Sequence, residues 1–375
     1  MNKIPFIDLA PQNLRLRDKL LSCVDEVICS GEFILGSQVQ AFEKEFAAYC
    51  GTKYAVGVSS GTDALFLSLL SVGIGKGDEV ICPVYTYIAT ALSISCTGAK
   101  PVFVDISPRT FNLDPSEIKK KISKKTKAII PVHLYGQPAY MGQILKIAKQ
   151  NNLKVIEDAA QAHGAVYIND QHNKQIVGAV GDIGCFSFYP TKNLSGCGDG
   201  GMITTSRKNI YQKLLILRDQ GRKGTNRYLH YLKGYNCRLD SIQAALLRVK
   251  LKELDAQNQL RRDKAGLYTK LLKKCQGITL PVQPDYAQSV FHIYAVLVKN
   301  RDKIYQELQK LNINTAKIYS CPLHLQPAYK DLGCQKGDFP CAEQVSKKIL
   351  CLPIYPGLKE ENIKFIVENL CKICG

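Results

Sequence analysis

Short apolar runs alternate with helix-like patterns between residues 54 and 205. Apolar positions three and four residues apart predict helices over Thr62–Val72, Thr86–Thr97 and Gly142–Asn151. Short runs that are mostly apolar predict strands over Tyr54–Ser59, Glu79–Pro83, Pro101–Asp105, Lys127–His133, Lys154–Asp158, Ile183–Phe188 and Met202–Thr205. Strands that alternate with helices predict an α/β fold with a mostly parallel central sheet and helices on both faces.

The pattern changes after Arg238. Residues Leu239–Lys274 are expected to form one long helix, rich in Leu, Lys, Gln and Ala. A strand-like run, Val290–Val298, then precedes two expected helices, Asp302–Leu311 and Glu360–Cys374. We therefore expect a large first domain, residues 1–250, and a smaller C-terminal α+β domain, residues 251–375.

The composition is that of a folded globular protein. The chain has 375 residues, of which 46% are hydrophobic and 22% charged, and this excludes disordered, collagen-like and low-complexity proteins. The 50 Lys and Arg residues exceed the 32 Asp and Glu residues, which gives a net charge of +18. Because the lysines are scattered, they favour a solvated surface over a nucleic-acid interface. A positive field that attracts a small anionic substrate is the second interpretation.

The 15 cysteines do not form a metal-binding pattern. Their only CxxC pair is Cys371 and Cys374, with no second pair at zinc-finger spacing. Residues 1–12 lack the apolar core of a signal peptide, so we expect a cytosolic protein with reduced thiols. No apolar stretch reaches the ~20 residues that a membrane helix needs, and neither a metal nor a membrane is expected.

Two segments at strand ends are candidates for anion and cation binding. The sequence Ser59-Ser60-Gly61-Thr62-Asp63 follows one strand and opens a helix, where free N–H groups bind phosphate well. An ordinary helix cap by Ser60 or Thr62 is the alternative. Asp158 ends another strand, where a carboxylate needs a cationic partner such as a protonated pyridine nitrogen. Capping of a helix is again the alternative.

Lys192 lies just beyond the apolar strand Ile183–Phe188. A lysine in such a position can lose its proton and form a Schiff base, although a solvated loop lysine is the common alternative. The glycines from Gly196 to Gly201 match GxGxxG, but a strand follows them, so a dinucleotide site is not expected. A phosphate site, an acid and a lysine in this order together predict a pyridoxal 5′-phosphate (PLP) site.

The chain also resembles a known family along nearly its whole length. Its motifs are similar to those of the DegT/StrS family of PLP-dependent sugar aminotransferases, which has the aspartate aminotransferase (type I) fold. The similar segments are Pro5–Leu9, Gly31–Gly36, Ser59–Leu65, Pro83–Tyr87, Leu134–Gln137, Glu157–Gly164, Ser187–Gly201, Gly234–Asp240 and Pro322–Pro327.

The resemblance implies roles around the cofactor ring. Lys192 would form the Schiff base with the cofactor and later move the proton between the cofactor and the sugar. Asp158 would keep the pyridine nitrogen protonated. Gln161 would contact the ring near its hydroxyl group, and Tyr87 would stack on the ring face. Relatives that deoxygenate sugars carry His at the lysine position, so Lys192 favours amino transfer.

Further roles concern the phosphate and the substrate. Gly61, Thr62 and Ser187 would bind the phosphate, and Asn236 would reach it from a neighbouring subunit, so the resemblance implies a homodimer with shared active sites. The family's substrate loop would include Tyr319 and His324.

The resemblance also implies a substrate class. L-glutamate would supply the amino group, and the acceptor would be a nucleotide-linked keto sugar. The residues Ser187–Gly201 favour the branch that aminates C3 of a dTDP-linked 3-keto-6-deoxyhexose. The alternatives are C3 amination of a UDP-linked 3-keto uronic acid and C4 amination of a 4-keto sugar nucleotide. A regulatory relative without turnover and a basic nucleic-acid binder are the remote alternatives.

Overall fold

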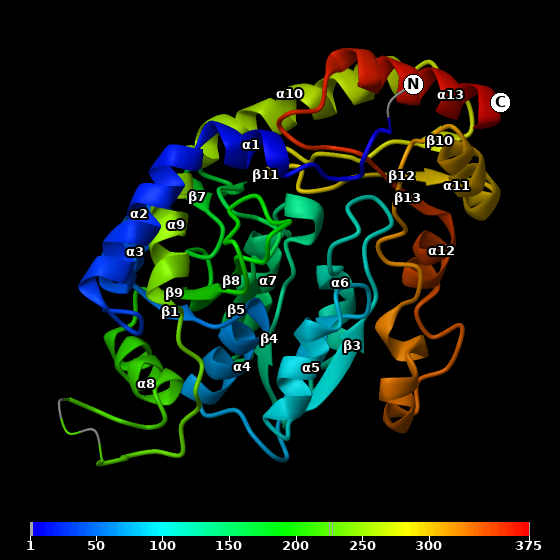
Figure 1. Ribbon diagram of the computed structural model, residues 1–375. Helices are drawn as coiled ribbons and strands as arrows, with labels where there is room; N and C mark the ends of the chain where they lie inside the picture. The colour runs from blue at the N-terminus through cyan, green and yellow to red at the C-terminus, as the bar shows by residue number, and fades with distance from the viewer. Residues whose placement is uncertain (1–2, 225, 227, 375) are drawn as a thin grey trace.

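The computed structural model describes residues 3–224, 226 and 228–374. A seven-stranded sheet with the order β1-β9-β8-β5-β4-β2-β3 forms its centre (Figure 1). Strand β9 pairs antiparallel with β1 and β8 on its two sides, and the other pairs of this sheet are parallel. The strands are β1 (Tyr54–Val58), β2 (Glu79–Pro83), β3 (Lys100–Val104), β4 (Thr126–Ile129), β5 (Lys154–Asp158), β8 (Ile183–Ser187) and β9 (Gly201–Thr205).

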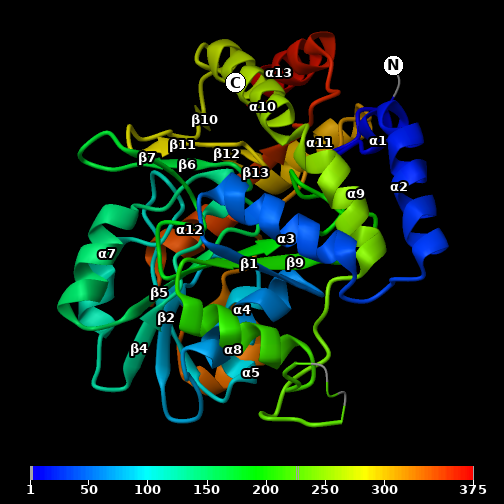
Figure 2. The same ribbon diagram turned by 90° about the vertical axis from the view of Figure 1, so that its left-hand side faces the viewer.

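Successive side chains of these strands point to opposite faces of the sheet and pack into two apolar cores, one on each face. Val80 and Cys82 of β2 pack into the core beneath α4 and α5, whereas Ile81 packs into the core beneath α3 and α7. The helices of this part are α1 (Ala10–Arg15), α2 (Arg17–Ser30), α3 (Ser37–Cys50), α4 (Gly61–Ser71), α5 (Ala89–Cys96), α6 (Pro115–Ile118), α7 (Met141–Gln150), α8 (Lys208–Arg218) and α9 (Ser241–Leu251). The prediction of a mostly parallel sheet covered on both faces is confirmed (Figure 2).

A third apolar core lies under α10 and α13, which run side by side along one edge of the molecule (Figure 1). Ile4 near the N-terminus joins this core and pairs with Ile313. A three-stranded antiparallel sheet supports it. The elements are α10 (Leu254–Leu272), β10 (Ile278–Thr279), β12 (Tyr294–Val298), α11 (Arg301–Lys310), α12 (Pro340–Lys348), β13 (Ile349–Leu352) and α13 (Glu360–Cys374), with one-turn helices at Leu323–Leu325 and Pro327–Leu332.

The single long helix expected over Leu239–Lys274 is wrong. The chain forms α9 and α10 with a break at Lys252 and Glu253. The two helices pack against different elements: α9 packs on α2 and α3, whereas α10 packs on α13. Both halves carry apolar residues at helical spacing, so the pattern of the sequence does not mark the change of direction.

A small third sheet was not expected from the sequence. Its strands are short and partly polar: β6 (Val166–Ile168), β7 (Lys174–Ile176) and β11 (Ala287–Gln288). The strand β11 brings residues of the expected C-terminal domain onto the first one. The division at residue 250 stays a prediction.

One disulfide departs from the expectation of reduced thiols. Cys275, after α10, is bonded to Cys371 of α13, and their Cα atoms are 5.4 Å apart. The prediction of reduced thiols is therefore wrong for this pair, and the cytosolic location stays a prediction. Within the described residues, no group of His, Cys, Asp and Glu could hold a metal ion. In the same part of the chain, none of the helices combines the length and apolar character of a membrane span.

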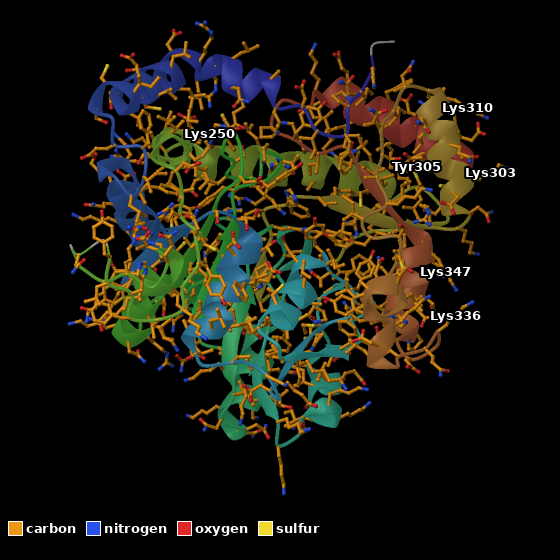
Figure 3. The ribbon with its side chains drawn as sticks, turned by 60° about the horizontal axis from the view of Figure 1, so that its bottom comes forward. Lys250, Lys303, Tyr305, Lys310, Lys336 and Lys347 are labelled. Carbon is orange, nitrogen blue, oxygen red and sulfur yellow. A yellow bond between two sulfur atoms is a disulfide. The ribbon has the colours of Figure 1, made fainter. Side chains whose placement is uncertain are left out.

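The lysines are distributed over separate elements. Figure 3 shows Lys303 and Lys310 on α11, Lys347 on α12 and Lys336 along one outer edge, apart from Lys250 on α9.

Candidate active site

A cavity of about 470 Å³ lies at the carboxyl ends of β5 and β8, beside the start of α4. Ligands bind at this edge in open α/β sheets. The structure brings together eight of the residues that the sequence analysis assigned to the site. These lining residues are Gly61, Thr62, Tyr87, Asp158, Gln161, Ser187, Lys192 and Tyr319.

The start of α4 forms one end of the cavity. Ser60 caps the helix by accepting a hydrogen bond from the N–H of Asp63 at 3.0 Å. The N–H groups of Gly61 and Thr62 have no acceptor within the helix because they belong to its first turn. A Cβ atom on Gly61 would stand 2.7 Å from the Cβ of Ser187. Glycine therefore keeps the helix start close to the end of β8, and an anion there would meet backbone and hydroxyl donors.

Asp158 is a buried carboxylate at the end of β5. It accepts hydrogen bonds from the Thr90 hydroxyl at 2.8 Å and the Ala160 N–H at 3.2 Å. Burial raises the pKa of Asp158, whereas these two hydrogen bonds and the charge of Lys192 oppose that rise. A cation bound in the cavity would stabilise the ionised form further.

The Lys192 amine also lines the cavity. Burial lowers its pKa to about 8, and the charge of Asp158 opposes that shift. The next residue holds the lysine loop in place, since the side-chain N–H of Asn193 donates to Asn258 at 2.8 Å and to the Val290 carbonyl at 3.1 Å. The loop that carries Lys192 is therefore held in place, and the amine loses its proton more readily than that of a solvated lysine.

Gln161, Tyr319 and Tyr87 lie next to one another in the lining of the cavity. The Gln161 amide donates to the Tyr319 hydroxyl at 3.1 Å. The rings of Tyr319 and Tyr87 lie 6.2 Å apart between centroids, and Tyr87 is 59% exposed. An exposed ring at a cavity mouth is free to stack on a planar ligand.

Two expected site residues do not line this cavity. His324 is buried in the one-turn helix Leu323–Leu325, where its Nε2 lies 3.1 Å from Oε1 of Glu343. Buried contact with a carboxylate makes this histidine part of the local packing in the isolated chain. Asn236 is exposed, and its backbone pairs with Asp219.

Three residues around the site escaped the sequence analysis. The Thr90 hydroxyl donates to Asp158, and the hydroxyl of Thr86, which lies before the start of α5, is 3.0 Å from that of Thr90. His292 lines the cavity, and its Nδ1 is hydrogen-bonded to Oδ1 of Asn193 at 3.1 Å. Burial lowers the pKa of His292 well below the ordinary value. A threonine pair four residues apart after a strand end was the available signal for Thr86 and Thr90. His292 had none, because it reaches the cavity from a distant segment.

The residues fit PLP on three structural observations. The glycine at the start of α4 and Ser187 suit its phosphate. The buried Asp158 suits its ring nitrogen, and Lys192, whose pKa is lowered by burial, lines the same cavity in reach of the cofactor.

Comparison with known proteins agrees with this site. Residues 15–371 match the family described as "DegT/DnrJ/EryC1/StrS aminotransferase family". A relative from Aneurinibacillus thermoaerophilus, named dTDP-3-amino-3,6-dideoxy-alpha-D-galactopyranose transaminase, is 45% identical over 97% of this chain and 98% of its own length. A "Pleiotropic regulatory protein" of Geobacillus stearothermophilus is 44% identical over 98% of each chain.

Solved structures are similar over the same length. S. venezuelae DesV, in complex with a ketimine intermediate, superimposes with a TM-score of 0.96 and is 40% identical, covering 100% of this chain and 99% of that one. The ntda protein of Bacillus subtilis, with bound cofactor pmp, gives a TM-score of 0.90 and is 30% identical, covering 100% of this chain and 86% of that one. From the matched residues, the relatives and the structures, the chain belongs to the DegT/DnrJ/EryC1/StrS aminotransferase family.

Proposed function

We propose that this chain moves an amino group from L-glutamate to the C3 keto group of a dTDP-linked 3-keto-6-deoxyhexose. Its family makes the chain a PLP-dependent aminotransferase of nucleotide sugars. The proposal adds the donor, the carbon, the base and the sugar. The observation that carries the amino-transfer chemistry is the pair of Asp158 and Lys192 in one cavity at the strand ends.

Three sets of residues in this chain have separate roles toward the cofactor: phosphate binding, protonation of the ring nitrogen and proton transfer. When bound, PLP supplies an electron sink and carries the amino group between the two half-reactions. Gly61, Thr62 and Ser187 bind its phosphate through helix N–H groups and a hydroxyl. Asp158 holds a proton on the ring nitrogen by its negative charge. Lys192 Nζ, with a pKa of about 8, exchanges a proton readily near neutral pH.

Two observations support C3 and dTDP. The relative from A. thermoaerophilus is named for a dTDP-3-amino sugar, and the residues Ser187–Gly201 are similar to the same branch. The basic net charge of +18 suits a substrate that carries a diphosphate.

A homodimer with shared sites is part of the proposal. Asn236 is exposed and lies outside its own cavity, which suits a role across an interface. Large apolar side chains nearby are also exposed, and exposed apolar patches mark interaction surfaces. They are Tyr228, Leu229, Tyr231, Leu232 and Tyr235. Heterodimers of N236A and K192A chains should regain one competent site, and verified heterodimers that stay inactive would exclude a shared site.

The experiment begins with the cofactor anchor. PLP is added to the purified protein, the visible absorbance is recorded, and borohydride then fixes the cofactor for peptide mapping. The label should lie on Lys192 and be lost in K192A. K250A is the matched control, because burial lowers the pKa of Lys250 as it does that of Lys192, but Lys250 does not line the cavity.

The second stage identifies the acceptor. The protein is loaded with the amino group from L-glutamate and then mixed with a dTDP-linked 3-keto sugar, a UDP-linked 3-keto uronic acid or a 4-keto sugar nucleotide. Discharge by the first compound supports the proposal. Preference for either of the others overturns the sugar assignment, and labelling without any discharge favours a regulatory protein.

A further inference from the structure

Two buried tyrosines hold the segment that carries Tyr319. The Tyr85 hydroxyl accepts a hydrogen bond from the Tyr319 N–H at 2.8 Å and donates one to the Tyr319 carbonyl at 3.0 Å. The Tyr135 hydroxyl donates to the carbonyl of Ile318. Three polar groups of one backbone segment are thus held by two phenol groups, here called the tyrosine clamp (Tyr85 and Tyr135).

The clamped segment connects two parts of the fold. Ala316 is paired with Cys351 of β13 by two backbone hydrogen bonds, at 3.1 and 2.8 Å, in the smaller sheet. Two residues later the chain meets the clamp, whose tyrosines follow β2 and β4 of the large sheet. The tyrosine clamp therefore sets where Tyr319 stands relative to the cavity wall.

Tyr135 adopts an uncommon backbone conformation. Its φ is 59° and its ψ is 12°, the left-handed region that a bulky residue rarely occupies. In this conformation its N–H donates to Oε1 of Gln161 at 2.7 Å. Strained residues of this kind persist where the surroundings fix them and are frequent at functional sites.

The hydrogen bond from Tyr135 to Gln161 also fixes the direction of the hydrogen bond between Gln161 and Tyr319. Because Oε1 of Gln161 accepts from Tyr135, the Gln161 side chain presents its NH₂ group to Tyr319. The Tyr319 hydroxyl therefore accepts at this contact, and its own proton is not used there. Burial raises the pKa of Tyr319, so the hydroxyl stays protonated.

We propose that Tyr85 and Tyr135 are positioning residues that direct the Tyr319 hydroxyl proton to an oxygen atom of the ligand in the cavity. The inference rests on the proposed function, because it needs a ligand with an acceptor oxygen there. That oxygen belongs either to the cofactor ring or to the keto sugar. Both are hydrogen-bond acceptors, and the experiment below separates them.

The experiment compares Y319F, Y85F and their double variant. Loss of one hydrogen bond to the ligand should weaken binding about tenfold in Y319F. Y85F should also weaken ligand binding, by about tenfold at most. Since Tyr85 acts through Tyr319, the double variant should bind no worse than Y319F alone.

Two readouts distinguish the source of the oxygen. A higher dissociation constant for PLP, measured by absorbance in the absence of any sugar, assigns the oxygen to the cofactor. An unchanged PLP constant with a raised KM for the keto sugar and an unchanged rate with L-glutamate assigns it to the sugar. The PLP arm does not depend on which sugar is used, so a wrong substrate assignment and a failed clamp give different results.

Y268F is the matched control. Tyr268 is also fully buried and donates to a backbone carbonyl, that of Pro353 at 2.9 Å, but it belongs to the core under α10 and α13. Y268F should lose stability without a change in either binding constant. Should Y85F fail to fold, Y135F takes its place. This variant loses the hydroxyl that holds Ile318 but keeps the backbone N–H that donates to Gln161. Wild-type values of both constants in Y85F or Y135F, or additive losses in the double variant, would overturn the proposal.

Discussion

Two neighbouring carboxylates of β5 face two different regions of the molecule. Glu157 and Asp158 are both buried, with 0% and 6% of their surface exposed. Because side chains alternate along a strand, Glu157 shares the face of Val155, in the core beneath α3 and α7. Asp158 shares the face of Ile156 and lines the active-site cavity.

The region around Glu157 is rich in hydrogen-bond donors. The carboxylate accepts from the backbone N–H groups of Gly178, Val180 and Gly181 at 2.8, 2.9 and 2.7 Å, and it lies 2.9 Å from Nε2 of His133. The Nδ1 atom of His133 accepts from the Ala139 N–H at 3.0 Å, which places a proton on Nε2. Protein donors therefore satisfy this carboxylate from several directions.

The region around Asp158 is poorer in donors. Thr90 and Ala160 supply two hydrogen bonds, and the ionised carboxylate has acceptor capacity to spare. The number of protein donors therefore separates the roles of these two buried acids. A fully satisfied carboxylate stabilises the fold, whereas an incompletely satisfied one is open to a cation brought by a ligand.

The largest expected effect is on turnover in D158N. The variant keeps the shape of the side chain but loses the charge that holds a proton on the cofactor ring. We expect kcat to fall roughly 10²–10³-fold. The free energy of unfolding should stay within about 1 kcal/mol of the wild-type value, because the lost charge was incompletely satisfied. Steady-state kinetics and urea unfolding of the cofactor-free protein measure the two quantities.

The matched variant E157Q should reverse this result. A glutamine there must direct its NH₂ group toward backbone N–H donors, so buried donors lose their acceptor. We expect a loss of about 3 kcal/mol in the free energy of unfolding. The kcat of the folded fraction should change less than about threefold, since Glu157 does not line the cavity. The contrast between the two acids fails if E157Q unfolds like the wild type or if D158N is the less stable of the two.

The sequence predicts the edge of the sheet where both acids lie. Its expected strand over Lys154–Asp158 coincides with β5, and Glu79–Pro83 coincides with β2, because buried parallel strands are compact apolar runs. It also predicts the residue types of the cavity, since a lysine and an acid after apolar strands are unusual enough to suggest chemistry.

Contacts between distant segments are not predictable in this way. The donors to Glu157 come from the loop at 178–181, and the tyrosine clamp joins segments more than 180 residues apart. Nothing in the local pattern marks Tyr85 or Tyr135 as different from an apolar core residue. The expected place of His324 in the substrate loop likewise depended on a resemblance, whereas its contact with Glu343 depends on the packing of α12.

The charge of Asp158 also acts on the pKa of Lys192, and this effect is smaller than those on turnover and stability. An amine reacts when it is unprotonated, so the rate of acetylation of Lys192 in the cofactor-free protein should rise with pH through a midpoint of about 8, below the ordinary lysine value of about 10.4. The charge of Asp158 raises the pKa of Lys192 and so opposes the effect of burial.

D158N should therefore move this midpoint to lower pH, because removal of a negative charge makes the protonated amine less stable. E157Q should leave it in place, since the carboxylate that acts on the Lys192 pKa among the described residues is Asp158. Competitive labelling with acetic anhydride at a series of pH values, followed by peptide mass spectrometry, measures both midpoints in parallel. Equal shifts in the two variants would mean that the two acids act on Lys192 through the whole fold, and an upward shift in D158N would contradict the role of its charge.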